Sequence, residues 1–168
     1  MRKRIINPAL QKSKDSDPNW LDIEKRAIVE VTSEEEAFPI ESALLPDKVS
    51  GWRASSSGKQ VIRLLFDKPQ RLQCINLMFE ELNIERTQEY VLRWSSDDGQ
   101  PSQEIVRQQW NFSPDGASSQ VENYYVDLPA VTLLELTITP DISDNNELAS
   151  IEKFRLAYKR ITICRSRY

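Results

Sequence analysis

Apolar and polar residues alternate along most of this chain from residue 60 onward. In residues 60–66, Ile62, Leu64 and Phe66 fall on one face by the period of two that a β-strand has, and that face is wholly apolar. Similar runs follow at residues 71–79, 87–94, 104–112, 120–128, 131–139 and 150–158. Residues 26–32 fit a first strand and residues 161–164 a short last one. No stretch of ten or more residues follows the 3.6-residue period of a helix.

Turn signals separate these runs. Asp97-Asp98-Gly99 and Pro114-Asp115-Gly116 are typical turn sequences, residues 67–70 contain a Pro, and residues 141–146 are polar. Many short strands with even spacing predict an all-β fold, a jelly-roll β-sandwich of about eight antiparallel strands.

Antiparallel strands send their connections alternately to two opposite ends. The connections at 46–58, 80–86, 113–119 and 140–149 therefore share one end. Those at 67–70, 95–103 and 129–130 share the other end, where the last strand also leaves.

Length and composition indicate one domain with two tails. We expect a polar, basic N-terminal arm over residues 1–19, a sandwich over 20–158 and a basic C-terminal tail over 159–168. The N-terminus lacks the apolar core of a secretory signal, and no apolar run is long enough for a membrane helix, so we expect a cytoplasmic protein and no membrane partner.

The chain contains no His, which removes the commonest general base and zinc ligand. Cys74 and Cys164 belong to no metal spacing, so free thiols are expected. Most hydrolase mechanisms are thereby excluded, and we expect no cofactor, no metal and no catalytic residues.

Charge is unevenly distributed. Residues 1–14 and 155–168 each carry five basic groups and no acid, so all 26 acidic residues lie between them. Clustered Lys and Arg bind phosphate, which raises a nucleic-acid hypothesis. The acidic body and the pI near 5.1 argue against it and favour solubilising ends or docking to an acidic protein.

The stretch from Trp52-Arg53 through the strand 60–66 to Asp67-Lys68-Pro69 resembles discoidin domains, the galactose-binding-like jelly rolls also found at the C-terminus of coagulation factors. The segments ERTQEYVLRWS, EIVRQQWNFSPDG and VTLLELTITPDIS are similar to a bacterial subgroup described as discoidin-domain or carbohydrate-binding-like proteins. The resemblance covers residues 28–158.

This resemblance implies a binding module whose ligands, often sugars, meet loops at the end opposite the termini. It also implies Asp47 as a conceivable calcium ligand. The chain departs from the family in two respects: it has no His for a sugar site, and Cys74 lies in a mid-chain strand instead of near one end.

The candidate ligand-binding residues are Trp52, Arg53, Glu80, Glu81, Arg86 and Asp115. Trp52 and Arg53 could form a stacking platform and a charged donor at the rim. The alternative is that Trp52 plugs the end of the sandwich and Arg53 covers it. We therefore hypothesise a non-catalytic module for a carbohydrate or other polar ligand. The alternative is a protein-interaction or assembly module that uses the basic termini or a sheet face.

Overall fold

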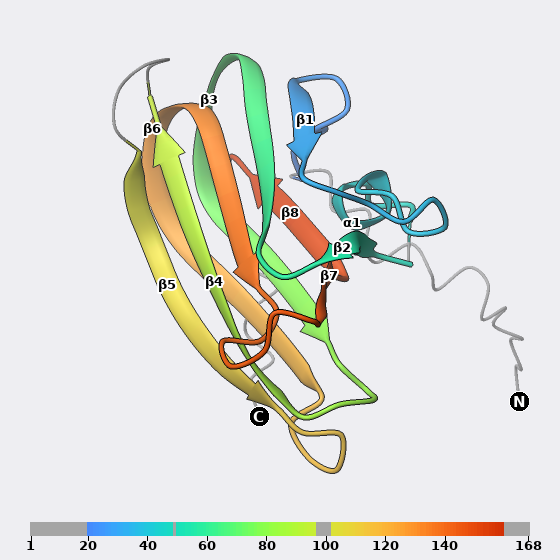
Figure 1. Cartoon of the computed structure of the whole chain (residues 1–168). Coiled ribbons are helices and arrows are strands. Elements are labelled where there is room, and N and C mark those ends of the chain that lie inside the picture. Colours follow the sequence, from blue (N-terminus) through green and yellow to red (C-terminus); the bar gives the residue numbers. More distant parts are fainter. Residues whose placement is uncertain (1–19, 49, 97–101, 160–168) are drawn as a thin grey trace, which may run out of the picture.

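Antiparallel strands make up most of the part of the chain that the computed structural model describes, residues 20–48, 50–96 and 102–159 (Figure 1). One four-residue helix, α1 (Glu41–Leu44), accompanies them. The strands in this part are β1 (Ala27–Val31), β2 (Trp52–Ser57), β3 (Gln60–Glu80), β4 (Arg86–Ser95), β5 (Gln103–Phe112), β6 (Ser119–Thr139), β7 (Leu148–Ile151) and β8 (Lys153–Ala157). The all-β prediction of about eight antiparallel strands is confirmed.

The two longest strands, β3 and β6, pair with each other along their whole length and bend together at one end of the molecule (Figure 1). The register slips at the bend, where four residues of β3 between Leu65 and Gln70 face one residue of β6. Pro69 and Pro129 fall in this bulged region, where a missing N–H breaks no ladder bond. The turns predicted at 67–70 and 129–130 to separate two strands are therefore wrong, because β3 continues through the first position and β6 through the second.

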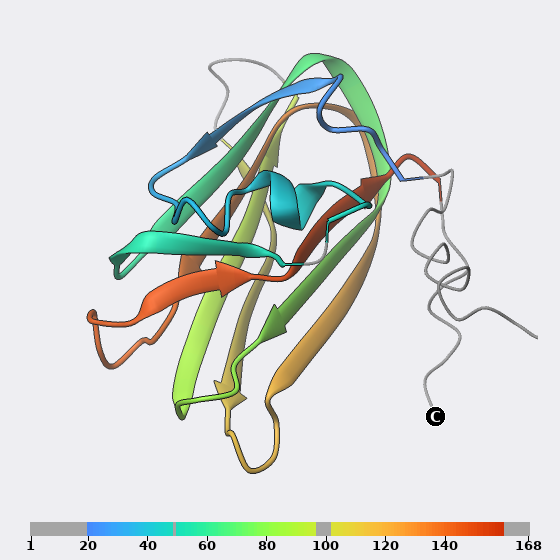
Figure 2. The same ribbon diagram turned by 90° about the vertical axis from the view of Figure 1, so that its right-hand side faces the viewer.

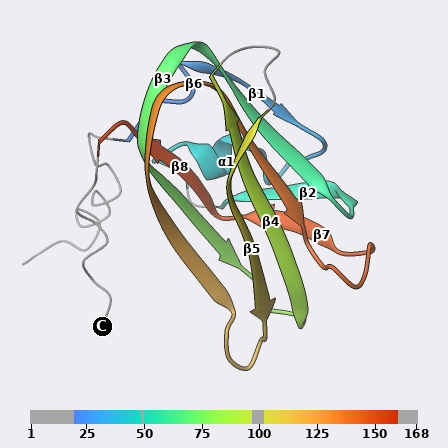
Figure 3. The same ribbon diagram turned by 90° about the vertical axis from the view of Figure 1, so that its left-hand side faces the viewer.

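The bend folds one continuous sheet into two layers. The first layer has the order β1, β3, β6, β4 and β5, and β8 pairs with the second half of β3 in the other layer. The strands β2 and β7 form a separate pair. Figure 2 shows β1, α1, β2 and β7 along one side of the sandwich, and Figure 3 shows β4 and β5 on the opposite side.

The alternating apolar residues fill the space between the layers, as predicted. Ile62 and Leu64 are fully buried and Phe66 is 8% exposed. Burial of such side chains stabilises a fold by roughly 1.5 to 3 kcal/mol each. The same core contains Leu72, Ile75, Leu77, Phe79, Tyr90, Leu92, Phe112, Leu134, Leu136, Ile138, Phe154 and Leu156.

The strand pattern differs from the prediction around residues 52 and 152. The predicted run 150–158 is divided into β7 and β8 at Glu152, whose N–H donates to the Met78 carbonyl at 2.8 Å. Part of the predicted loop 46–58 is the strand β2, which pairs with β7. Gly51 precedes it at φ 71°, and a Cβ there would lie 2.8 Å from the Ile151 carbonyl oxygen. This close approach requires glycine.

The two ends of the described chain lie side by side. Trp20 forms an antiparallel bridge to Ala157, and the Leu21 N–H donates to the Leu156 carbonyl at 2.7 Å. Ala157 pairs with Cys74, a few residues beyond the bend of β3. The two ends of the described chain therefore lie at the bent end of the sandwich.

The connections 81–85, 113–118 and 140–147 lie at the opposite end, which confirms the grouping predicted for 80–86, 113–119 and 140–149 (Figure 1). The prediction is wrong for most of the fourth connection, 46–58: the Gly58 N–H donates to Glu147, but Trp52 pairs with Ile151 and is buried in the core.

The N-terminal arm and most of the C-terminal tail lie outside the described residues, and so does the predicted strand at 161–164. These assignments and the cytoplasmic location stay predictions. Within the described residues, no helix has the length and apolar character needed to cross a membrane.

Candidate ligand-binding site at the loop end

Three connections form the end of the sandwich that lies opposite Trp20 and Ala157: residues 81–85, 113–118 and 140–147, here called the loop end. Backbone hydrogen bonds join these loops to one another and to the strands. The Glu81 N–H donates to the Ser118 carbonyl at 2.8 Å, and the Ile142 N–H donates to the Thr87 carbonyl at 2.9 Å. The turn before β3 also takes part, because the Gly58 N–H donates to Glu147 at 2.9 Å.

Arg86, the first residue of β4, is a buried cation beneath these loops. Its side chain is 3% exposed, and Nη1 donates to the carbonyl oxygens of Pro140 at 3.0 Å and Leu148 at 3.4 Å. Nε lies 3.2 Å from Oε1 of Glu81 and forms an ion pair with it. The two atoms are not aligned for a hydrogen bond, so Nε has no hydrogen-bond partner. The guanidinium also lies over the Phe112 ring, 5.5 Å from its centroid. Arg86 thus joins the loops 81–85 and 140–147 and contacts the end of β5, from which the loop 113–118 begins.

Burial lowers the pKa of Arg86, and the nearby carboxylates of Glu81, Glu147 and Asp141 oppose that shift. An arginine stays charged because its ordinary pKa lies far above neutral pH. The loop end is therefore built around a permanent positive charge that its own carboxylates compensate.

The three loops combine exposed apolar and polar side chains. Leu82 is 61% exposed and Ile142 is 51% exposed. Exposed polar residues accompany them on the three loops: Asn83, Glu85, Asp115, Ser143, Asp144, Asn145 and Asn146. This composition can contact both the C–H face and the hydroxyls of a polar ring compound.

Side chains within the loop 140–147 fix its shape. The Asp141 carboxylate accepts hydrogen bonds from the Ser143 N–H at 3.1 Å and from its hydroxyl at 2.9 Å. The Asp144 carboxylate accepts from the Asn146 N–H at 2.9 Å. Such local hydrogen bonds order a turn without a helix or strand.

Trp52 does not lie at the rim, so its assignment as a stacking platform is wrong. Its side chain is 1% exposed, and its Nε1–H donates to the Ser33 carbonyl at 3.2 Å. The residue begins β2 opposite Ile151 and turns inward into the core. The alternative stated from the sequence holds in part: the indole packs in the core, whereas the Arg53 guanidinium lies over Phe38.

Arg53 and Glu80 belong to a second group on the β2 side of the molecule. The Arg53 guanidinium lies over the Phe38 ring, 4.4 Å from its centroid. Burial raises the pKa of Glu152, the negative charge of Glu80 raises it further, and Arg53 opposes the shift. Glu80 and Arg53 therefore both lie near Glu152, away from the core position of Trp52.

The six predicted residues do not form one site. Glu81 and Arg86 are partners beneath the loop end, whereas Asp115 is exposed on the loop 113–118. No hydrogen bond or ion pair within the described residues joins Asp115 to the other five. The prediction missed Leu82 and Ile142; their signal was an apolar residue inside a polar loop that the strand count placed at this end.

The structure gives no support to Asp47 as a calcium ligand. In the described ranges, no group of three or more His, Cys, Asp or Glu side chains could hold a metal ion. Two surface cavities, of about 330 and 490 Å³, lie away from the loop end, one between β1 and α1 and one beside Lys68.

Solved structures share this architecture although the sequences differ. The module CBM32-3 from a family 31 glycoside hydrolase of Clostridium perfringens matches with a TM-score of 0.60 and 19% identity over 87% of this chain and 99% of its own. This chain has the fold of the family 32 carbohydrate-binding modules. The galactose-binding-like jelly roll implied by the discoidin resemblance is thereby confirmed as a fold.

Two further structures extend the comparison. The family 32 module of Clostridium perfringens NanJ, solved with galactose, gives a TM-score of 0.54 and 16% identity over 82% of this chain and 97% of its own. A GH29 fucosidase of Ruminococcus gnavus gives 0.60 and 10% identity over 87% of this chain, which spans 26% of that longer protein. No family model and no curated protein sequence matches the chain.

Proposed function

We propose that this chain is a non-catalytic carbohydrate-binding module and that its sugar binds at the loop end. The observation that carries the proposal is the exposure of Leu82 and Ile142 among amide and carboxylate side chains, on the two loops, 81–85 and 140–147, that Arg86 joins. The NanJ module supports the proposal, because it shares the fold and was solved with galactose.

Sugar recognition at this surface follows from its side chains. A pyranose ring has an apolar face of C–H groups that can lie on the aliphatic side chains of Leu82 and Ile142. Amides such as Asn83 donate and accept hydrogen bonds, and carboxylates such as Asp115 accept them from sugar hydroxyls. Recognition of this kind combines a non-specific apolar contact with directional polar contacts.

The three loops contain no aromatic residue and no His, so aromatic stacking contributes nothing at the loop end. Aliphatic side chains offer a smaller, less rigid platform than an aromatic ring. We therefore expect weak binding of a single sugar, with a dissociation constant of about 1 mM, or about 4 kcal/mol. A longer glycan that contacts more than one loop would bind more tightly.

The absence of catalysis is part of the proposal. Glu80 and the half-buried Glu152 are one pair of neighbouring carboxylates, and burial raises the pKa of Glu152. Neither residue lines the 330 Å³ or the 490 Å³ cavity, whereas catalytic carboxylates usually face a pocket that holds the substrate. A binding role at the exposed loop end therefore fits the structure better than acid and base chemistry at these two carboxylates.

A glycan array followed by calorimetry with the best-bound glycan tests the proposal. We expect Leu82→Asp with Ile142→Asp to weaken binding at least about tenfold, because both apolar contacts are replaced by charge. Ile28→Asp is the matched control, since Ile28 is 64% exposed on β1, away from the loop end. Equal binding by the double variant and wild type, or no binding to any glycan, would reject the proposal.

A further inference from the structure

One edge of the first layer is open. Among the described strands, β1 pairs with β3 alone. The Thr32 N–H donates to the Val61 carbonyl at 3.1 Å and the Asp67 N–H to the Arg26 carbonyl at 2.9 Å. In an antiparallel ladder that pattern turns the peptide groups of Val29 and Val31 away from β3. Unpaired peptide groups along a strand edge are a template for another strand.

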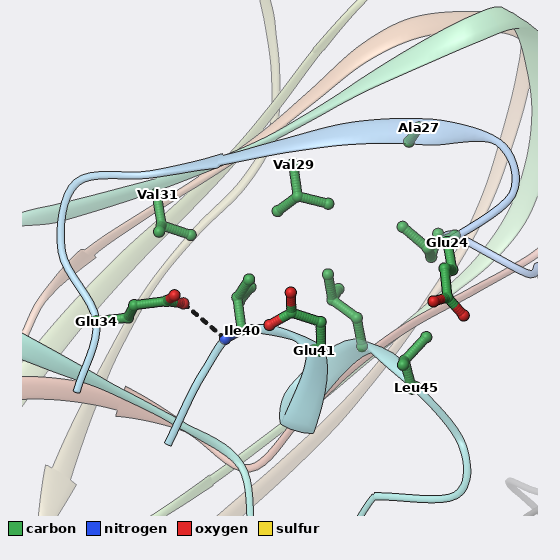
Figure 4. A pocket seen from close by; sticks show the side chains of 10 residues that line it. Glu24, Ala27, Val29, Val31, Glu34, Ile40, Glu41 and Leu45 are labelled. Atoms are coloured by element: carbon green, nitrogen blue, oxygen red, sulfur yellow. Dashed lines mark hydrogen bonds between the residues drawn. The ribbon is translucent and has the colours of Figure 1, made fainter. Parts of the chain in front are cut away.

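A groove lies directly beside this edge. It has a volume of about 330 Å³ and runs between β1 and α1. Figure 4 shows the side chains of Ala27, Val29 and Val31 pointing across it toward Ile40 and Leu45. We call this hollow the β1–α1 groove. Its floor is apolar, and the open peptide groups of β1 follow one side of it.

Carboxylates surround the β1–α1 groove. Of its ten lining residues, three are acidic, Glu24, Glu34 and Glu41, and none is basic. All three are exposed, and Glu34 also accepts a hydrogen bond from the Ile40 N–H at 2.9 Å (Figure 4). On the opposite face of β1, Glu30 and the 64% exposed Ile28 alternate. The groove therefore suits an extended segment that carries both apolar and cationic side chains.

The chain itself contains such a segment outside the described residues. Residues 2–6 read Arg-Lys-Arg-Ile-Ile and are followed by Asn7-Pro8, and residues 1–14 carry five cations and no acid. The described chain begins at Trp20, three residues before Ile23, which lines the groove. The twelve or so residues between the segment and Trp20 can span up to about 40 Å. The segment can therefore reach the groove of its own molecule.

We propose that residues 2–6 bind in the β1–α1 groove of the same chain as an added strand on the open edge of β1. By the period of two, Lys3 and Ile5 share one face of this strand, and Arg4 and Ile6 share the other. One face of the added strand places an isoleucine in the groove and a cation at its acidic rim. The other face places an isoleucine beside Ile28 and a cation beside Glu30. Pro8 ends the strand because it cannot continue a ladder. The added strand covers an edge that would otherwise invite pairing between molecules.

Hydrogen exchange of the ¹⁵N-labelled full chain tests the proposal, because the Val29 and Val31 amides face the open edge. We expect these two amides to exchange at least about tenfold more slowly in the wild type than in Ile5→Asp with Ile6→Asp. The matched control is Ala9→Asp with Leu10→Asp, which places the same charges outside residues 2–6 and is expected to leave the protection unchanged. The Ile28 and Glu30 amides, which face β3, report whether the fold itself is intact.

Charge reversal provides an independent test of the same contact. Glu24→Lys with Glu41→Lys is expected to remove the protection of Val29 and Val31, and adding Arg2→Glu with Lys3→Glu is expected to restore it. Rapid exchange of both amides in the wild type would overturn the proposal, and so would protection that increases with protein concentration, since that indicates a second copy. Leu82→Asp at the loop end should leave the protection unchanged, so failure of this proposal and failure of sugar binding are separable.

Discussion

Replacement of Arg86 by Met is the change that most directly perturbs the loop end. Methionine keeps an unbranched apolar stem in the buried space but removes the guanidinium. The change leaves the carbonyl oxygens of Pro140 and Leu148 without their donor and leaves Glu81 without its cation. It also removes the cation over the Phe112 ring.

The size of the effect follows from burial. Removing one partner of a buried ion pair costs about 3 to 5 kcal/mol, because the other charge stays desolvated. The Glu81 side chain is 17% exposed, so water can solvate it in part. We therefore expect a loss of about 3 kcal/mol, at the lower end of that range.

Urea denaturation of wild type and Arg86→Met measures this loss, and an unchanged slope would show that the unfolded state is unaffected. Arg63→Met is the control: its Nε lies 2.7 Å from Glu135, but its side chain is 47% exposed, and such surface pairs contribute about 0 to 1 kcal/mol. A loss below about 1 kcal/mol for Arg86→Met, or equal losses for the two variants, would refute the role of burial.

Three further predictions concern single side chains. Trp52→Ala should lower the free energy of unfolding by about 3 to 5 kcal/mol in urea denaturation, and a loss below about 1 kcal/mol would contradict the core position of the indole. Because burial raises the pKa of Glu152 above the ordinary 4.5, the folded state holds this proton more tightly than the unfolded state. Stability should therefore fall as pH rises from about 4.5 through the folded pKa, and the fall should be smaller in Glu152→Gln; identical pH profiles of the unfolding free energy would contradict this. Gln88 is fully buried, and neither of its side-chain polar atoms has a hydrogen-bond partner. Gln88→Leu should therefore raise the free energy of unfolding by about 1 kcal/mol and raise the melting temperature; a lower melting temperature would contradict this.

The strand content and the grouping of loops at one end could be predicted because both depend on a pattern local to the sequence. Alternation such as Ile62, Leu64 and Phe66 identifies a strand with one buried face, and the structure buries all three. Counting strand reversals predicted that the connections 46–58, 80–86, 113–119 and 140–149 share one end, and the last three do. The count stayed correct for these three connections although two turns proved to be bends, because a strand that bends over the sandwich also reverses direction.

The errors arose where long-range pairing overrides a local signal. Pro69 and Pro129 signal chain breaks, yet the two bulges oppose each other and the ladder between β3 and β6 resumes beyond them. The strand β2 has the polar sequence Trp-Arg-Ala-Ser-Ser-Ser and forms because β7 pairs with it. Neither event has a local signature, because each depends on a partner strand far away in the sequence.

The site was predicted in part. The strand count identified the loop end correctly, but the residue types suggested the wrong contacts within it. Trp52 was chosen as an aromatic next to an arginine, whereas its burial depends on Ser33 and Ile151 from distant segments. Leu82 and Ile142 were overlooked because exposed aliphatic residues in loops resemble scattered surface residues.

An NMR titration of the ¹⁵N-labelled full chain with galactose, followed by the best-bound glycan from the array, tests the central claim most directly. Binding at the loop end predicts amide shift changes that cluster in residues 81–85, 113–118 and 140–147 and leave β1 unchanged. Shift changes that cluster instead in the β1–α1 groove or around Arg53, or no saturable change with either sugar, would contradict it.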